Sequence, residues 1–386
     1  MTNLVTNSSK IMTQKSGYME FGIFLDKTQA DIQNLLSQIH YAHRAYEELP
    51  QSLPMIVDLL DKEIIASSIF STTSIEGTAL ESEEEVEKVL ALPPQELKTV
   101  EQKASVNMRE AYNYARKVPQ EPGFELTEEH IKRIHALVTK DIPHKYNTPG
   151  YYRDNPRDVP IYVGHERVGG KYRPPKTLQD IEVLMRGFIE WVNDGIGVED
   201  PLLVAPIVHL YFELIHPFWD GNGRVGRVLE AMILKAGNYR HAPFLMAKYY
   251  RSHIEEYFSL FNQCRKAMEK KDPTAHYPFL KFFLEGFLAS VEETKSRVIS
   301  LVRIMASRDY FARLRQNKKI NQRQHTILLE LLDRGAVSRK ELELQPWHSA
   351  LYRDHTSMTR FRDLSKLLQA SLLYEKDGKL AVFFLP

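Results

Sequence analysis

Apolar residues recur at helical spacing along most of this chain. In the segment 127–140, Ile131, Ile134, Leu137 and Val138 fall on one face of a helix. Similar spacing predicts a helical region at 26–116 and helices at 177–192, 201–215, 225–236, 248–269 and 277–300. The pattern therefore predicts a mainly α fold, in which a bundle of helices surrounds an apolar core.

One segment near the middle of the chain lacks this spacing and is rich in β-forming residues. Val159–Val163 and Tyr172–Pro175 are two such runs, and Gly164 and Gly169–Gly170 mark the turn region between them. We predict a β-hairpin here. A surface hairpin without a binding role and a hairpin that contacts a partner both fit the pattern.

The last part of the chain, residues 301–386, is built from shorter elements. Helices are predicted at Asn321–Leu332, after the capping box Ser338-x-x-Glu341, and at Thr356–Ala370. The third helix places five apolar residues on one face, namely Met358, Phe361, Leu364, Leu367 and Leu368. Strands at Leu372–Lys376 and Lys379–Leu385 flank Asp377–Gly378, which is a type I′ turn signal. Three helices followed by a hairpin resemble a small winged-helix domain.

Charge is distributed unevenly between this part and the rest of the chain. Residues 301–386 contain 16 Lys and Arg against 9 Asp and Glu, a net charge of +7, whereas the whole chain carries only +1. Arg360, Arg362 and Lys366 on the third helix are candidates for contacts with DNA phosphates. A module for protein docking or dimerisation, with its basic residues in solvent, is the alternative.

Composition narrows the class of protein. With 386 residues, 43% hydrophobic and 26% charged, the chain is typical of a soluble protein of two or three domains. The sequence contains no apolar run of about 18 residues, and its start lacks the apolar core of a secretory signal. The single cysteine, Cys264, excludes an internal disulfide, which is compatible with a reducing compartment. Together these features lead us to expect a cytoplasmic protein without a membrane segment.

The densest polar chemistry lies in the string HPFWDGNGRVGR, residues 216–227. Pro217 disfavours the α conformation at His216, so the preceding helix should end there. Two glycines allow the backbone to approach a ligand, and the following helix start supplies anion-binding N–H groups. Arg224 and Arg227 lie on neighbouring positions of that helix, where guanidinium groups can bind phosphate in bidentate fashion. Asp220 is a hard ligand suited to Mg²⁺ on a nucleotide. A helix stop, a turn or a solvated arginine pair accounts for each fragment alone, but not for the whole string.

The string resembles the signature of the Fic (filamentation induced by cAMP) family, and the resemblance extends over residues 60–300. It implies a Fic helical bundle with a hairpin flap and transfer of AMP from ATP to a Ser, Thr or Tyr hydroxyl of a target protein. His216 would be the catalytic base and Asp220 the Mg²⁺ ligand. The nucleotide-binding residues would be Gly221, Asn222, Gly223, Arg224, Val225, Gly226 and Arg227.

A second motif, Thr72-x-x-x-Glu76-Gly77, resembles the inhibitory motif of Fic proteins. The resemblance implies that Glu76 pairs with Arg227 and takes the guanidinium meant for the γ-phosphate of ATP. Taken by itself, Glu76-Gly77 is equally typical of an ordinary helix C-terminus. The predicted hairpin corresponds to the target-binding flap, with Ile161 and Tyr162 as candidate contacts.

These observations predict three domains: an N-terminal helical region at 1–116 with the inhibitory helix at 60–78, a Fic core at 117–300 and a winged-helix-like domain at 301–386. The predicted function is an adenylyltransferase held inactive by Glu76. The alternatives are a DNA-binding regulator that uses the core as a nucleotide sensor, or a Fic enzyme that transfers another group or removes AMP. A homodimer is compatible with the sequence.

Overall fold

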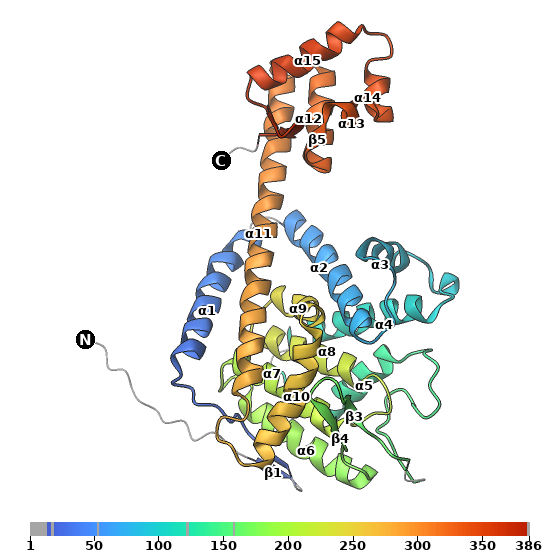
Figure 1. Ribbon diagram of the computed structural model, residues 1–386, viewed down its shortest axis with the longest axis vertical. Coiled ribbons are helices and arrows are strands. Elements are labelled where there is room, and N and C mark those ends of the chain that lie inside the picture. The colour runs from blue at the N-terminus through green and yellow to red at the C-terminus, as the bar shows by residue number, and fades with distance from the viewer. Residues whose placement is uncertain (1–13, 17–18, 52–53, 121–122, 157–158, 384–386) are drawn as a thin grey trace, which may run out of the picture. The chain divides into compact units, whose positions relative to one another are not determined.

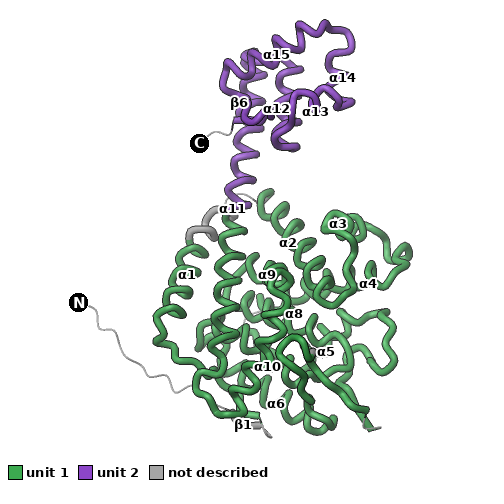
Figure 2. Tube along the Cα trace, in the orientation of Figure 1, with its two compact units in different colours: residues 1–295 green, residues 296–386 purple. Residues whose placement is uncertain are grey.

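The computed structural model describes residues 14–16, 19–51, 54–120, 123–156 and 159–383. The start of the chain, on which the expectation of no secretory signal rests, and Leu385 lie outside these residues. Helices dominate and strands are few and short, so the predicted mainly α fold is confirmed (Figure 1). The chain divides into two compact units, 1–295 and 296–386 (Figure 2). Within the described ranges no helix is long and apolar enough to cross a membrane.

The first unit is organised around two helices, α7 (Pro201–Ile215) and α8 (Asn222–Ala236), which pack against each other. Every residue from Leu202 to Ile215 is buried, as is typical of a helix that is apolar on all sides. The other helices of the unit are α1 (Ala30–Gln51), α2 (Pro54–Ile75), α3 (Glu83–Leu90), α4 (Val100–Lys117), α5 (Glu128–Val138), α6 (Leu178–Gly195), α9 (Met246–Ser252), α10 (Ile254–Glu269) and the first part of α11 (Tyr277–Gln316). The six-residue connection from α7 to α8 thus starts and ends in the core.

Three helix boundaries differ from the prediction. The helix expected at 225–236 already begins at Asn222, because the glycines around it accept the geometry of a helix start. The helix expected at 248–269 is broken at His253, where the backbone leaves the helical region with φ of −123°. The helix expected to end at 300 continues to Gln316, since no Gly or Pro occurs between residues 300 and 316. The predicted boundary between core and C-terminal domain therefore falls inside α11.

The first unit contains two antiparallel pairs of strands, β1 (Gln14–Ser16) with β2 (Met19–Phe21) and β3 (Val163–His165) with β4 (Gly170–Tyr172). The second pair is the predicted hairpin, but it is displaced from the predicted runs. Its register pairs Val163 with Tyr172 and His165 with Gly170, so Ile161 and Tyr162 precede the strand. Prolines at 160, 174 and 175 explain the shift, because they cannot donate to a ladder.

The second unit follows the predicted order of elements. After α12 (Gln322–Arg334) come β5 (Val337–Ser338), α13 (Arg339–Glu343), α14 (Pro346–Leu351), α15 (Ser357–Gln369), β6 (Leu373–Lys376) and β7 (Lys379–Val382). The strands form one antiparallel sheet in the order β5-β7-β6. Asp377 and Gly378 have φ of 52° and 73°, as a type I′ turn requires. The assignment of this unit as a winged helix stays a prediction.

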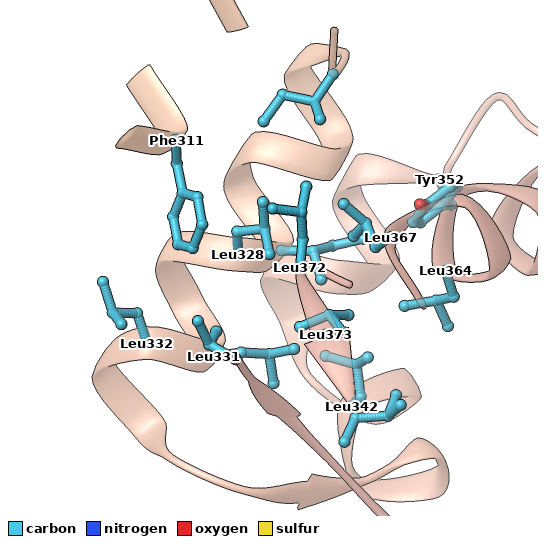
Figure 3. Packing of buried hydrophobic residues seen from close by; sticks show 14 residues of the cluster. Phe311, Leu328, Leu331, Leu332, Leu342, Tyr352, Leu364, Leu367, Leu372 and Leu373 are labelled. Carbon is cyan, nitrogen blue, oxygen red and sulfur yellow. The ribbon is translucent and has the colours of Figure 1, made fainter. Parts of the chain in front are cut away.

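An apolar core holds the second unit together (Figure 3). Leu328 and Leu331 of α12 pack with Leu364 and Leu367 of α15 and with the sheet. The apolar face predicted for α15 is only partly used, because Met358 and Phe361 are 62% and 59% exposed. The core that α12 and the sheet form covers the second half of α15 and leaves its first turns in solvent.

Candidate active site

The loop between α7 and α8 begins at His216, which ends α7 as predicted. Its backbone is left-handed, with φ of 50°, a conformation that is uncommon for a residue with a side chain. Arg153 stabilises this turn: its Nε donates to the His216 carbonyl at 2.8 Å and its backbone N–H donates to the Pro217 carbonyl at 2.9 Å. Although Arg153 is buried, its guanidinium is thus tied to the backbone that carries His216.

The side chain of Asn222 holds the loop closed. Its Oδ1 accepts from the N–H of Phe218 at 3.0 Å, and its Nδ2 donates to the carbonyl of the same residue at 2.9 Å. Gly221 caps α8 with φ of 83°, and a methyl group there would lie 2.9 Å from Thr139. Asn222 can therefore offer a ligand only its backbone, because both polar atoms of its side chain are bonded.

The start of α8 presents free donors to the loop. The N–H groups of Asn222, Gly223 and Arg224 belong to the first helical turn, where the helix itself offers no acceptor. The N–H of Val225 already donates to the Gly221 carbonyl at 2.9 Å. Together with the helix dipole, the first three groups make this end of α8 an anion-binding position.

His135 on α5 forms hydrogen bonds that support the loop. The sequence analysis did not identify this residue. Its Nδ1 accepts from the N–H of Gly150 at 2.8 Å, which leaves its Nε2 to donate to the Asp220 carbonyl at 3.1 Å. Its ring stacks on Phe218 with 3.6 Å between centroids. Burial lowers the pKa of His135 to about 4, so the ring stays neutral and keeps one donor and one acceptor. In the sequence this histidine is only one member of an amphipathic helix.

Arg224 and Asp220 face each other across the first turn of α8. The Nη2 atom of Arg224 donates to Asp220 Oδ2 at 2.9 Å, and its Nη1 donates to the Val138 carbonyl at 3.3 Å. The arginine side chain is 4% exposed, whereas that of the aspartate is 29% exposed. Within the described ranges no three His, Cys, Asp or Glu side chains gather as ligands for a metal ion. Asp220 is thus a single accessible carboxylate beside an anion-binding helix start.

Arg227 and Glu76, which lie 151 positions apart in the sequence, form an ion pair. The distance from Arg227 Nη2 to Glu76 Oε1 is 2.5 Å, and Arg227 Nε donates to Thr72 Oγ1 at 2.7 Å. Burial by itself lowers the pKa of Arg227, but Tyr257 and the Glu76 carboxylate outweigh it, so its pKa lies above the ordinary range. The guanidinium is therefore charged and held by Thr72 and Glu76 of the second motif.

The Glu76 carboxylate also lies against the start of α8. A methyl group added at Gly223 would approach Glu76 Oε1 to 2.6 Å. Glu76 follows the last residue of α2, and Gly77 has φ of 72°. Glu76-Gly77 is therefore also an ordinary helix C-terminus, as the alternative interpretation predicted. The helix end thus aims a carboxylate at the anion-binding position.

The loop, α7 and most of α8 lie in a segment that matches a known domain family. Residues 125–234 match the model of the Fic/DOC family. This chain contains a Fic/DOC domain. A probable protein adenylyltransferase of Aquifex aeolicus is 30% identical over 149 residues, which are 38% of this chain and 42% of that protein. Protein adenylyltransferase Fic of Drosophila erecta is 27% identical over 178 residues, which are 44% of this chain and 32% of that protein. The matches therefore span less than half of these relatives.

Two crystal structures share the Fic fold. A Fic family protein from Desulfovibrio desulfuricans G20 aligns with a TM-score of 0.55 at 19% identity and covers 92% of this chain and 96% of its own. A Fic domain containing signaling protein from Bacteroides thetaiotaomicron also has a TM-score of 0.55, at 17% identity, and covers 70% of this chain and 97% of its own. At these identities the comparisons show the fold alone.

Within the Fic domain, His216 has a carboxylate neighbour that the motif does not contain. The Nδ1 atom of His216 lies 3.6 Å from Glu213 Oε2, one helical turn earlier on α7. Burial raises the pKa of Glu213, but the adjacent His216 outweighs it and keeps the pKa below its ordinary value. Glu213 therefore places a buried carboxylate beside the ring of His216.

The hairpin is anchored next to His216. The hydroxyl of Tyr172 on β4 donates to the Glu213 carbonyl at 2.5 Å, and Asn262 of α10 donates to the Gly169 carbonyl. Tyr162 is 51% exposed, and its hydroxyl accepts from Arg173 Nη2 at 2.6 Å. The Fic domain therefore holds the hairpin at the end of α7 that carries the candidate base.

Proposed function

We propose that this chain is a protein adenylyltransferase that moves AMP from ATP to a Ser, Thr or Tyr hydroxyl of a target protein. The names of the relatives support the reaction class. The observation that carries the proposal is the pair of buried guanidinium groups, Arg224 and Arg227, at a helix start that directly follows His216. Buried cations at an anion-binding helix end suit the phosphates of a nucleotide.

In the proposed reaction His216 accepts the proton of the target hydroxyl. The hydroxyl oxygen then forms a bond to the α-phosphorus, and the bond from that phosphorus to the bridging oxygen breaks, so pyrophosphate leaves. Imidazole is suited to this step near neutral pH. Glu213, 3.6 Å from the ring, stabilises the protonated base. The hairpin with Ile161 and Tyr162 would hold the target segment beside it.

The phosphates would bind at the N–H groups of Asn222, Gly223 and Arg224, with Arg224 on the phosphate tail and Arg227 on the γ-phosphate. We assign Val225 and Gly226 a supporting role, because the Val225 N–H is already bonded and Gly226 packs against His209. Positioning and charge stabilisation of this kind supply most of the catalysis in transfer from nucleotides.

Asp220 fits a Mg²⁺ ion that arrives with the nucleotide. Its carboxylate is 29% exposed, and only Oδ2 bonds to Arg224. One protein carboxylate suffices for Mg²⁺ when phosphate oxygens and water complete the shell. The ion would neutralise charge on the phosphates, while Arg224 and His135 hold Asp220 in place.

The resting protein is autoinhibited in this proposal. The Glu76 carboxylate is bonded to Arg227 at 2.5 Å and lies against Gly223, so an anion already takes the place meant for the γ-phosphate. A bound ATP would lose its arginine partner and meet a like charge. Displacement of α2 or loss of the carboxylate would free the guanidinium.

ATP labelled separately at the α- and γ-positions tests the reaction class. We expect protein-bound label from α-labelled ATP only, weak in the natural chain, strong in Glu76→Gly and absent in the double variant Glu76→Gly/His216→Ala. Retention of γ-label would replace adenylylation by phosphorylation. Loss of preformed AMP from a target would instead identify the removal of AMP.

For the second unit we propose contact with the phosphate backbone of duplex DNA. A groove of about 510 Å³ lies between the end of α11, the start of α12 and α15, and its basic lining residues are Arg315, Lys318, Lys319 and Lys366. Arg360, by contrast, stacks on Tyr352 and lies 3.9 Å from Glu343. The proposed DNA contact therefore rests on the basic groove and not on the whole exposed face of α15. DNA binding through this groove would also fit the alternative function, a regulator that uses the Fic domain as a nucleotide sensor.

A further inference from the structure

A chain of buried hydrogen bonds leads away from Arg227 on the side opposite to Glu76. Arg227 Nη1 donates to the Tyr257 hydroxyl at 3.3 Å, and that hydroxyl lies 3.1 Å from His209 Nε2. His209 Nδ1 lies 2.8 Å from Glu230 Oε2, which also accepts from the Tyr250 hydroxyl at 2.8 Å. All five side chains are buried, and the motif explains none of the bonds beyond Arg227.

The direction of these bonds follows from the chemistry of the groups. A guanidinium can only donate, so the Tyr257 oxygen accepts from Arg227 and its own proton points to His209 Nε2. The other ring nitrogen of His209 then carries the proton that it donates to the Glu230 carboxylate. Burial raises the pKa of Tyr257 above its ordinary value, so the phenol keeps its proton. One arrangement satisfies every partner, and it turns a lone pair of Tyr257 toward Arg227.

Arg227 is thus held from two sides. Thr72 and Glu76 come from the end of α2, and Glu76 must leave when a γ-phosphate takes its place. Tyr257, His209 and Glu230 come from α10, α7 and α8 of the first unit, in which α7 packs against both α8 and α10. Removal of Glu76 leaves this second set in place, together with the bond from Arg227 Nε to Thr72.

We propose that Tyr257, oriented by His209 and Glu230, is the positioning residue that keeps Arg227 in its phosphate-binding pose after Glu76 has been displaced. The proposal rests on the proposed role of Arg227 at the γ-phosphate. It also explains Gly226, since a methyl group there would lie 2.7 Å from the His209 ring. The motif glycine lets His209 approach the helix that carries Arg227.

Nucleotide affinity separates this role from general stability. In the full-length Glu76→Gly protein, the binding of Mg·ATP and Mg·ADP is measured by calorimetry, with the unfolding temperature as a check on the fold. We expect Tyr257→Phe to weaken ATP binding about tenfold, the usual effect of a lost hydrogen bond to a charged group, and ADP binding less than twofold. ADP has no γ-phosphate for Arg227 to hold.

Tyr250→Phe is the matched control, because it removes the same atom from a ring that stacks 4.5 Å from Tyr257 but leaves the bond to Arg227 intact. Its hydroxyl bonds to Glu230 at the far end of the hydrogen-bond chain, so we expect it to lower ATP affinity less than Tyr257→Phe does and to leave ADP affinity unchanged. His209→Gln and His209→Leu form a second pair, in which only the glutamine keeps an acceptor for Tyr257. The leucine variant should lose ATP affinity and the glutamine variant should retain most of it.

Arg227→Ala in the same background distinguishes a failure of the positioning role of Tyr257 from a failure of the γ-phosphate role of Arg227. If Arg227→Ala lowers ATP affinity selectively and neither Tyr257→Phe nor His209→Leu does, the positioning role is overturned while the γ-phosphate role stands. If Arg227→Ala itself weakens ATP and ADP equally, the role of Arg227 falls and the positioning role falls with it. A selective loss in all three variants supports both.

Discussion

Arg224 and Arg227 at the start of α8 expose 4% and 3% of their side chains, whereas Arg308 and Arg313 in the second unit expose 46% and 70%. The first two make hydrogen bonds to hydroxyls, carbonyls and single carboxylates inside the Fic domain. The other two pair with neighbouring surface aspartates. Burying a guanidinium costs several kcal/mol, and a carboxylate partner offsets this cost without a large net gain, so these buried pairs contribute little to the stability of the domain.

The two units show that a high content of basic residues does not by itself create a strong anion-binding site. The second unit has the more basic sequence, yet most of its ion pairs are solvated and contribute little. The first unit has a net negative charge and nevertheless contains the better anion site, because burial, helix dipole and hydrogen bonds concentrate positive potential at one point. Five experiments test the contrast, in order of decreasing effect.

His216→Ala should lower adenylyl transfer by about 10²–10⁴-fold, the usual contribution of a general base. Nucleotide binding should persist, because the phosphates are held by α8. Transfer is measured with α-labelled ATP in the Glu76→Gly background. His355→Ala in the second unit is the control and should keep full activity; equal activity of both variants would remove His216 from the mechanism.

Glu76→Gly should raise transfer about 10–100-fold, because it removes the carboxylate that occupies Arg227, and a charged hydrogen bond contributes about 1.5–3 kcal/mol. Glu81→Gly, which removes an exposed carboxylate five residues later, is the control. Initial rates with α-labelled ATP measure the effect. Unchanged labelling in Glu76→Gly would contradict the autoinhibition.

Acid should destabilise the first unit through His276, which is fully buried and accepts from the Phe24 N–H at 3.0 Å. Burial lowers its pKa to about 3, so below pH 6.5 the unfolded chain binds a proton that the folded chain does not. The stability it contributes is complete above pH 6.5 and falls by about 2 kcal/mol at pH 5. Urea denaturation at both pH values measures the loss, and His276→Gln should show a smaller one.

His135→Leu should slow transfer about tenfold and lower stability by about 2 kcal/mol, because it leaves the Gly150 N–H and the Asp220 carbonyl without their partner. His135→Gln keeps a donor for Asp220 and should lose less of both. Rates and unfolding temperatures compare the pair. Equal losses in the two variants would show that ring packing on Phe218, not the hydrogen bond, matters.

Lys318→Glu combined with Lys366→Glu should weaken binding of a short DNA duplex several-fold and reduce the slope of log K against log salt by about 2. Adenylyl transfer should not change. Arg313→Glu with Arg334→Glu is the control of equal charge outside the groove. Fluorescence anisotropy follows binding, and equal losses in both variants would leave only a general effect of charge.

Several elements of this protein could be predicted from residues that are adjacent in the sequence. Pro217 ends α7 at His216, the apolar spacing of 201–215 marks a helix buried on all sides, and Asp377–Gly378 makes the predicted turn. The hairpin was predicted in the right region, but its strands lie nearer the turn than the predicted runs, because prolines at 160, 174 and 175 interrupt those runs. These elements depend on neighbours along the chain, which a sequence displays directly.

The residues that support the loop and Arg227 could not be predicted from the sequence in the same way. His135, Glu213, His209 and Tyr257 sit in helices whose pattern explains them as ordinary members, and their partners lie on other elements. Such a side chain has a structural or a functional role according to which polar groups the fold places within about 3 Å of it. The sequence by itself determined the chemical groups of the loop and the helix ends that expose them. The resemblance already implied the pair of Glu76 and Arg227. Only the tertiary structure decided that Tyr257 lies on the other side of the guanidinium, because helix packing brings residues from α2, α8 and α10 to one buried point.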